Sequence, residues 1–220
     1  MPKKKRDIHN HSERVPASLT REAFDQGLQF LSARDPDLSR ILTKLGPPPM
    51  WARAPGFPTL ILIILEQQVS LAAARAAYDR LQEAATPLTP GRFLELDDET
   101  LKDIGFSRQK AAYGRDLARA LVKGHLDLDA LVMMPDTDVR AELIKVKGIG
   151  PWTADIYLLM ALGRPDIMPS ADLALATATQ KVKNLTSRPT PDELNTISNN
   201  WKPWRAVAAR ILWHYYLNGR

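Results

Sequence analysis

Two glycines separated by one residue mark the first stretch of the chain whose residue types could do chemistry. Residues 143–154 read LIKVKGIGPWTA, with Gly148 and Gly150 between two apolar runs that are typical of helices. Glycines at this spacing allow positive φ angles and leave backbone N–H groups uncovered by side chains. Such groups at a helix N-terminus favour an anion. With Lys145 and Lys147 beside the turn, the segment predicts a helix–hairpin–helix that holds a phosphodiester backbone without reading its sequence. An ordinary connection between two helices is the alternative.

An acidic residue follows this turn at a distance that one helix and one further turn would span. Asp172 lies 22 residues after Gly150, directly behind the segment MPSA, at the expected start of the next helix. If these two helices are antiparallel neighbours, the carboxylate returns to the hairpin. A first-turn acid also has an ordinary explanation, because capping and the helix dipole stabilise a helix by about 0.3–1 kcal/mol. Taken alone, Asp172 leaves a catalytic and a structural interpretation open.

The elements that must position these residues are helical. Alternating strand patterns are nearly absent, whereas helix caps and apolar stripes recur along the chain. Thr20 and Asp35 each precede such a stripe, and Gly46 followed by three prolines ends the second one. The sequence therefore predicts an all-α fold. Further predicted helices cover residues 70–85, 89–94, 97–104, 108–123, 137–144, 152–162, 191–199 and 204–218, and another starts near 169–172.

The composition excludes several classes of protein. The 220 residues contain no cysteine, which excludes disulfides, a thiol nucleophile, cysteine-bound zinc and an iron–sulfur cluster. The longest purely apolar run covers residues 60–65, and these six residues fall far short of the roughly 20 that span a bilayer. We therefore expect a soluble intracellular protein with no membrane partner.

The net charge of +5 is concentrated at the N-terminus. Residues 3–6 (KKKR) supply four of the 30 basic residues, so the other 26 nearly balance the 25 acidic ones. We interpret residues 1–18 as a basic flexible tail, with a nuclear-import signal as the alternative. His9 and His11 belong to this tail rather than to a metal site. The bulk charge alone is therefore weak evidence for a nucleic-acid partner.

Five short segments in a fixed order carry a resemblance to a known family. They are DPDL at 35–38, EQQVS at 66–70, GFSRQK at 105–110, the hairpin together with MPSAD at 168–172, and WKPWR at 201–205. From about residue 19 onward the chain resembles the helix–hairpin–helix (HhH-GPD) DNA glycosylases, in particular the bacterial 3-methyladenine DNA glycosylase II branch. We expect no counterpart here of the N-terminal β-subdomain of larger members, because strand patterns are nearly absent.

The resemblance implies a two-lobed all-α fold with a cleft between the lobes. Residues 19–58 and 166–220 are expected to form one helical lobe. Residues 59–165 are expected to form the other lobe, which contains the helix–hairpin–helix at about 143–162.

The resemblance also implies a chemistry, the excision of alkylated purines such as 3-methyladenine and 7-methylguanine from double-stranded DNA. Asp172 matches the catalytic aspartate, whose carboxylate stabilises the oxocarbenium character of the sugar and activates water after the base has left the stack. This chemistry requires no cofactor. In relatives that also cut the strand, a lysine stands two residues after the second hairpin glycine. Here that position is Trp152, which predicts a monofunctional enzyme that leaves an abasic site.

Four residues match the base pocket of the family. Trp152 and Trp213 offer indole faces that attract a cationic base by about 0.5–2 kcal/mol each. A place in the hydrophobic core is the alternative for both. Where some relatives have tyrosines, this chain has Ile156 and Leu173, which makes the pocket more aliphatic.

Other residues match positions that contact DNA. Gln68 matches the wedge that fills the hole left by the flipped base, and Gln67 could read the opposite strand. The alternative is that two amides simply end a helix. The carbonyls of Ile144, Val146 and Ile149 match those that hold a monovalent cation, Na⁺ or K⁺, in the family. The remaining expected DNA contacts are Lys145, Lys147, Gly148, Gly150 and Thr153.

Two other functions remain open at this point. The chain could be a non-catalytic DNA-binding module that uses the hairpin only to dock, or a bifunctional glycosylase and strand-cutting lyase. We expect the protein to be a monomer that works on the nucleoid in the bacterial cytoplasm, or in the nucleus if the organism is eukaryotic.

Overall fold

The computed structural model describes residues 18–218, and this part of the chain contains helices and no strand. The predicted all-α fold is confirmed. The basic run at 3–6 and the two tail histidines lie outside the described residues. Within residues 18–218, no helix has the length and apolar character that a membrane crossing requires.

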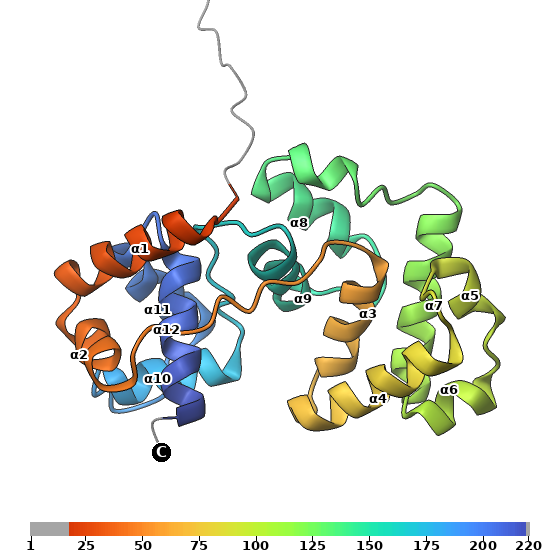
Figure 1. The fold of residues 1–220 in the computed structure, drawn as a ribbon, viewed down its shortest axis with the longest axis horizontal. Coiled ribbons are helices and arrows are strands. Elements are labelled where there is room, and N and C mark those ends of the chain that lie inside the picture. The colour runs from red at the N-terminus through yellow and green to blue at the C-terminus, as the bar shows by residue number, and fades with distance from the viewer. Residues whose placement is uncertain (1–17, 219–220) are drawn as a thin grey trace, which may run out of the picture.

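One group of helices combines the two ends of the described chain. It lies on the left in Figure 1, where α12 packs against α1, α2 and α10. Helices that are more than a hundred residues apart in sequence thus share one core. The members are α1 (Arg21–Arg34), α2 (Pro36–Leu45), α10 (Leu173–Val182), α11 (Pro191–Ser198), the 3₁₀ helix η3 (Asn199–Trp201) and α12 (Arg205–Asn218).

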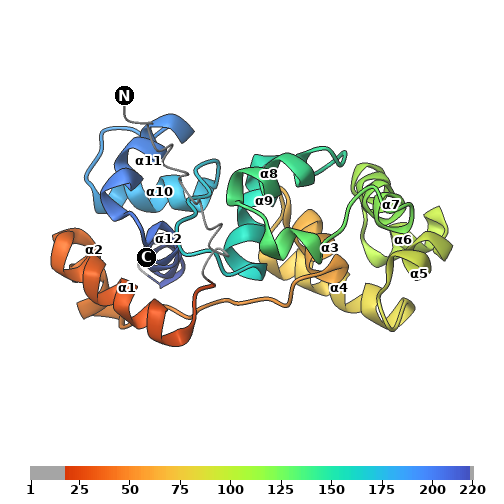
Figure 2. The ribbon, with the colours of Figure 1, turned by 90° about the horizontal axis from the view of Figure 1, so that it is seen from above.

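The middle of the chain forms a second group, on the right in Figure 1. Within this group, α8 and α9 lie toward the first group, and α5, α6 and α7 lie farthest from it (Figure 2). The members are α3 (Phe57–Glu66), α4 (Leu71–Ala84), α5 (Pro90–Glu95), α6 (Asp98–Ile104), α7 (Arg108–Val122), η1 (Ala130–Met133), α8 (Asp136–Ile144), α9 (Pro151–Ile156) and η2 (Tyr157–Ala161).

Local sequence signals account for the helix ends nearest the N-terminus. The Thr20 hydroxyl accepts a hydrogen bond from the N–H of Ala23 and caps α1. The Asp35 carboxylate caps α2 in the same way, with Pro36 in the first turn. Gly46 ends α2 at a φ of 74°, a conformation that glycine adopts without steric cost. The connector of residues 46–56 then crosses from the first group to the second (Figure 1).

The helix predicted over residues 152–162 is not a continuous α-helix. It is α-helical only to Ile156 and continues as the π-helix η2, where the N–H of Leu162 donates to the carbonyl of Tyr157. Two tertiary contacts involve residues of this wider turn. The carbonyl of Leu159 accepts from the Arg210 guanidinium at 3.0 Å, and the hydroxyl of Tyr157 accepts from the N–H of Gly56. The sequence pattern alone contains neither contact.

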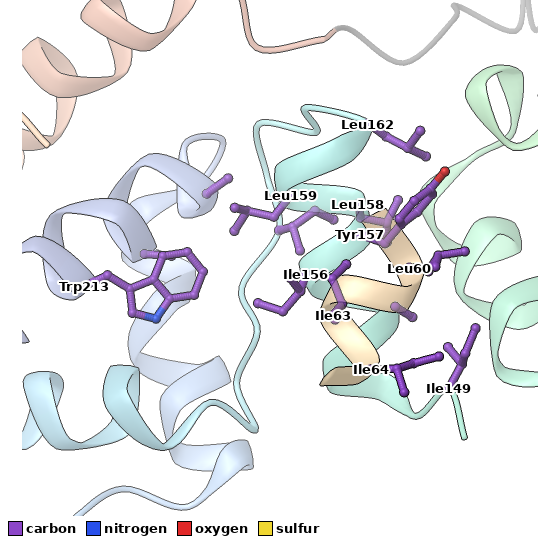
Figure 3. Close-up of a cluster of buried hydrophobic side chains, with 14 of the residues drawn as sticks. Leu60, Ile63, Ile64, Ile149, Ile156, Tyr157, Leu158, Leu159, Leu162 and Trp213 are labelled. Atoms are coloured by element: carbon purple, nitrogen blue, oxygen red, sulfur yellow. The ribbon is translucent and has the colours of Figure 1, made fainter. Parts of the chain in front are cut away.

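Buried apolar side chains fill the space beside the hairpin helix. Figure 3 shows Ile156 and Leu159 between Trp213 of α12 on one side and Ile63 of α3 on the other. All four side chains are buried. Helix α9 and its continuation η2 therefore connect the two groups of helices and set the distance between the residues that face the cavity described next.

Candidate functional site

A cavity of about 1360 Å³ lies where the two groups of helices meet. Its walls come from the connector, the turn between α3 and α4, the start of α9, the start of α10 and the last turns of α12. Nine residues that the sequence singles out line it together: Gln67, Gln68, Gly150, Trp152, Thr153, Ile156, Asp172, Leu173 and Trp213.

Asp172 faces this cavity and accepts three hydrogen bonds from N–H donors. As the N-cap of α10, its Oδ1 atom accepts from the backbone N–H of Leu175 at 2.9 Å. The indole Nε1 of Trp213 donates to the same oxygen at 3.2 Å. The indole Nε1 of Trp152 donates to Oδ2 at 2.9 Å. The structural and the chemical interpretation of Asp172 are therefore compatible, because one carboxylate caps a helix and also lines the cavity.

Trp152 and Trp213 contact Asp172 in addition to lining the cavity, as the predicted base pocket requires. Each lines the cavity, and the indole nitrogen of each donates a hydrogen bond to the Asp172 carboxylate. Trp213 is 9 % exposed, so it belongs to the core as well as to the cavity wall. Trp51 packs against it edge-on, with ring centroids 6.4 Å apart. Leu173 lies at the mouth with 62 % of its surface exposed.

Gly148 and Gly150 differ in backbone conformation and in the space around the position of a Cβ atom. Gly148 has a φ of 94°, and a Cβ atom at this position would overlap the ring of Tyr113 on α7. Gly150 has a φ of −96°, and no atom lies within 4 Å of the position that its Cβ would occupy. The expectation that both glycines supply positive φ is therefore wrong for Gly150. Its missing side chain instead leaves open space in front of the hairpin backbone.

The start of α9 has N–H groups that no side chain caps. Gly150 is the N-cap and has no side-chain oxygen, and Pro151 has no N–H. The uncapped donors next in line are the backbone N–H groups of Trp152 and Thr153. The side chain of Thr153 is only 1 % exposed and accepts a hydrogen bond from Gln67. A phosphate contact at Thr153 is therefore restricted to its backbone N–H.

The hairpin lysines are both exposed but differ in their partners. The Lys145 ammonium forms an ion pair with Glu142 at 2.6 Å, one turn earlier on α8. Lys147 has no ion pair among residues 18–218. Exposed pairs of this type contribute little to stability. Both side chains are therefore free to move toward a phosphate.

The turn between α3 and α4 places its two glutamines differently. Gln68 is exposed and adopts a φ of 57°, in the left-handed region that non-glycine residues rarely occupy. Gln67 is half-buried, and its Nε2 donates to the carbonyl of Gly148 at 2.9 Å and to the Thr153 hydroxyl at 3.0 Å. The amide nitrogen of Gln67 thus already has two acceptors in the hairpin, and the expected contact with the opposite strand stays a prediction.

Trp51, Arg53 and Glu66 are among the cavity residues that were not predicted. Trp51 has a φ of 46°, and the connector that holds it offers only a proline-rich composition as a signal. Arg53 and Glu66 form an ion pair in the wall, with two hydrogen bonds of 2.7 and 2.9 Å. Glu66 had a weak signal, since it interrupts the apolar run of α3. The sequence does not indicate that Arg53 would meet it.

The backbone carbonyls predicted to hold a monovalent cation lie at the end of α8 and in the turn. The carbonyl of Val146 accepts from the N–H of Ile149 at 3.0 Å, which leaves it one free lone pair. The carbonyl of Ile144 belongs to the last residue of α8, where the helix dipole is negative. Backbone carbonyl oxygens of this kind are suitable ligands for a monovalent cation. Residues 18–218 contain no group of three or more His, Cys, Asp or Glu side chains that could hold a metal.

The fold and the site together define a class of protein: an all-α molecule with a hairpin beside a cavity that holds one oriented carboxylate. The sequence model of the HhH-GPD superfamily of base excision DNA repair proteins matches residues 61–204. The chain belongs to this superfamily.

Individual relatives agree with this assignment. A DNA-3-methyladenine glycosylase of Bacillus subtilis is 35 % identical over 122 residues, which are 56 % of this chain and 40 % of the relative. The alkylbase DNA glycosidase-like protein mag2 of Schizosaccharomyces pombe is 30 % identical over 198 residues, 86 % of this chain and 92 % of that protein. The chain spans 55 % and 40 % of the length of two Bacillus subtilis relatives.

Solved structures have the same fold. The 3-methyladenine DNA glycosylase Mag1 of Schizosaccharomyces pombe, in complex with abasic DNA, superposes with a TM-score of 0.80 at 26 % identity, covering 86 % of this chain and 95 % of that one. A DNA-3-methyladenine glycosidase from Bacillus halodurans gives a TM-score of 0.72 at 27 % identity, covering 88 % and 90 %.

Proposed function

We propose that this protein is a DNA glycosylase that flips alkylated purines out of double-stranded DNA and releases them by hydrolysis. The observation that carries the proposal is the position of Asp172. Its carboxylate lies in the wall of a cavity beside a hairpin with uncapped N–H groups, and two indole nitrogens orient it. The family and the names of its members support the same function.

The Asp172 carboxylate acts on the sugar. When the bond between sugar and base breaks, positive charge develops on the sugar ring, and a carboxylate held in place near C1′ stabilises it without reorganisation. The same oxygen atoms accept a hydrogen bond from the attacking water. The base must leave the stack to bring this bond into the cavity, whose volume of about 1360 Å³ has room for a purine.

The cavity wall favours bases that carry positive charge. The rings of Trp152 and Trp213 contribute cation–π attraction, and Ile156 and Leu173 exclude water from the base. Methylation at N3 or N7 of a purine gives such a cation and also weakens its bond to the sugar. We therefore expect 3-methyladenine and 7-methylguanine among the substrates.

The hairpin holds the DNA backbone beside this cavity. The uncapped N–H groups of Trp152 and Thr153 bind a phosphate oxygen, and the open space at Gly150 admits it. Lys145 and Lys147 add charge without base contacts. A monovalent cation on the carbonyls of Ile144, Val146 and Ile149 would fix the turn. The enzyme acts as a monomer wherever the genome lies, on the bacterial nucleoid or in a eukaryotic nucleus.

The test of this proposal replaces Asp172 with asparagine. Asp172→Asn keeps a helix cap, because asparagine caps as well as aspartate does. We expect the release of bases from methylated DNA to fall by about 100-fold or more, with unchanged affinity for the DNA. Asp192→Asn is the matched control, since Asp192 is an exposed first-turn acid of α11. Chromatography of the released bases, from wild type and both variants, measures the effect.

Two results would contradict this function. Release by Asp172→Asn at the wild-type rate would remove the catalytic role of the carboxylate. Wild-type protein that binds methylated DNA but releases no base would instead be a non-catalytic DNA-binding module.

The monofunctional reaction has its own test. Trp152 stands where strand-cutting relatives have their lysine, so no amine is available at this position for a Schiff base. Incubation with damaged DNA and borohydride is expected to give no covalent adduct between protein and DNA. A trapped adduct, seen as a shifted band on a denaturing gel, would show a glycosylase with lyase activity.

A further inference from the structure

The end of α3, directly before the turn of residues 67–70, is anchored to α7 by a lysine. The Lys110 ammonium donates to the carbonyl of Leu65 at 2.7 Å, in the last turn of α3. The carbonyls of a last helical turn have no partner within the helix, so the lysine satisfies one of them and complements the negative end of the helix dipole. Burial lowers the pKa of Lys110, since desolvation disfavours its charged form.

A second anchor ties the same turn to the hairpin. The Gln67 amide reaches two acceptors there, the carbonyl of Gly148 and the hydroxyl of Thr153. Thr153 is buried in the first turn of α9, next to the uncapped N–H groups that face outward. The position of the turn is thus linked to the segment proposed to hold a phosphate.

A third anchor lies on the cavity side. The carboxylate of Glu66 pairs with both terminal nitrogens of Arg53 at 2.7 and 2.9 Å, a bidentate geometry that fixes both planes. The backbone N–H of Arg53 in turn donates to the carbonyl of Met160 in η2 at 2.8 Å. The residues on the N-terminal side of Gln68 are therefore held by α7, by the hairpin and by the connector.

Gln68 itself projects from this anchored turn in a strained conformation. Its side chain is exposed and its φ is 57°, in the left-handed region that is unfavourable for a non-glycine residue. Such strain persists only where the surrounding contacts determine the backbone. Just beyond, the Ser70 hydroxyl caps α4 by accepting from the N–H of Ala73, so the exit of the turn is fixed as well.

We propose that Lys110 and Gln67 are positioning residues that keep the turn preformed, with Gln68 already aimed at the DNA. A preformed turn loses no conformational freedom when Gln68 enters the duplex, so the two anchors raise the affinity for DNA with an emptied base position. This inference rests on the proposed function and on Gln68 as the inserted residue. It assigns Gln67 an internal contact and gives a role to Lys110, which does not line the cavity.

The test measures binding to two duplexes, one intact and one with a tetrahydrofuran abasic analogue. Lys110→Met and Gln67→Met remove the anchoring donors and keep an unbranched apolar side chain of similar length. We expect each to weaken binding to the abasic duplex by about tenfold, and binding to the intact duplex by less than about twofold. Lys102→Met on α6 and Gln29→Met on α1 are matched exposed controls that should bind like wild type.

A second set of variants separates positioning from general support of the fold. If the anchors act through Gln68, then Lys110→Met and Gln67→Met lose no further affinity for the abasic duplex once Gln68→Ala is present. Additive losses would overturn the proposal, as would equal losses on both duplexes or a Gln68→Ala variant that binds like wild type. The assay needs no base release, so a wild type without glycosylase activity would refute the proposed function and leave this measurement valid.

Discussion

An acidic residue at the start of a helix can be a helix cap or a functional group, and the Asp172 carboxylate caps α10 and also lines the cavity. A helix cap uses one carboxylate oxygen. Here Oδ1 accepts from the backbone N–H of Leu175 and, at a longer distance, from the indole of Trp213, while Oδ2 accepts from the indole of Trp152. The cap therefore orients the side chain that the chemistry needs instead of competing with it. The two indole donors hold this carboxylate in a fixed orientation at the cavity wall.

The two hairpin glycines make a matched pair of mutations at the residue scale. Gly148→Ala forces a side chain into the Tyr113 ring and into a positive φ, so we expect the free energy of unfolding to fall by about 2 kcal/mol or more. Gly150→Ala meets no atom of the protein, and we expect its melting temperature to stay within about 2 °C of wild type. Thermal unfolding followed by circular dichroism measures both.

Gly150→Ala, the variant that we expect to be as stable as wild type, should be impaired in DNA binding. A methyl group at position 150 occupies the open space where the phosphate is proposed to approach, so Gly150→Ala should bind duplex DNA about tenfold more weakly. Titration of a fluorescent duplex with folded protein checks this. Unchanged affinity would remove Gly150 from the phosphate contact.

At the scale of elements, one buried ion cluster joins the start of α2 to the end of α10. The Lys183 ammonium contacts Asp35 at 2.7 Å and Asp37 at 2.8 Å, and the indole of Trp201 donates to Asp35 at 2.7 Å. Burial raises the pKa of Asp35, but the bonds from Lys183 and Trp201 outweigh it and leave the pKa lowered. For Lys183 burial lowers the pKa, and the bonds from Asp35 and Asp37 outweigh it and raise the pKa.

These two shifts predict how stability depends on pH. A lowered pKa means that the Asp35 contribution is present above the ordinary value of 3.8 and is lost as the pH falls through the folded-state pKa. A raised pKa means that the Lys183 contribution is complete below 10.5 and is lost as the pH rises through its folded-state pKa. The cluster therefore stabilises the first group of helices across the whole neutral range.

Lys183→Met tests this cluster. The variant leaves the buried Asp35 carboxylate without a cation, while Asp37 keeps its ion pair with Arg40, so we expect the free energy of unfolding at pH 7 to fall by roughly 1–3 kcal/mol, and less of the difference to remain at acid pH. Urea unfolding at several pH values measures it. Lys181→Met, an exposed neighbour on α10, should unfold like wild type. An equal loss in both variants would assign the effect to helix propensity instead.

At the scale of the whole molecule, a buried arginine holds three segments together. The Arg210 guanidinium donates to the carbonyls of Met50 in the connector, Ala206 in its own helix and Leu159 in η2. The side chain is 1 % exposed, and burial lowers its pKa to about 10. Because η2 and the connector both line the cavity, this contact fixes the distance between its walls.

Arg210→Met should therefore weaken the fold and the site together. Three carbonyls lose their donors, and we expect the free energy of unfolding to fall by about 3 kcal/mol. The affinity for the abasic duplex should fall with it, measured at a temperature where the variant is folded. Arg40→Met, an exposed arginine of α2, is the matched control. A variant as stable as wild type would show that packing alone holds these segments.

The sequence by itself determined the features that depend on near neighbours. Caps at Thr20 and Asp35, the hairpin at Gly148 and a carboxylate at the start of α10 follow from residues within a few positions of one another. Helix hydrogen bonds and dipoles act over one or two turns, so local patterns contain what decides them. The family resemblance extends this reading to Asp172 because it fixes the order of the segments.

Only the tertiary structure decided which residues meet across the cavity. Trp51 meets Trp213, Arg53 meets Glu66, and Gln67 turns into the hairpin rather than outward. The partners in these pairs are between 13 and 162 positions apart, and their contacts depend on how whole helices pack. The same packing converts the end of the predicted 152–162 helix into a π-helix. Periodicity reports the face of a helix but not the side chain on the neighbouring one, so these contacts could not be predicted from the sequence.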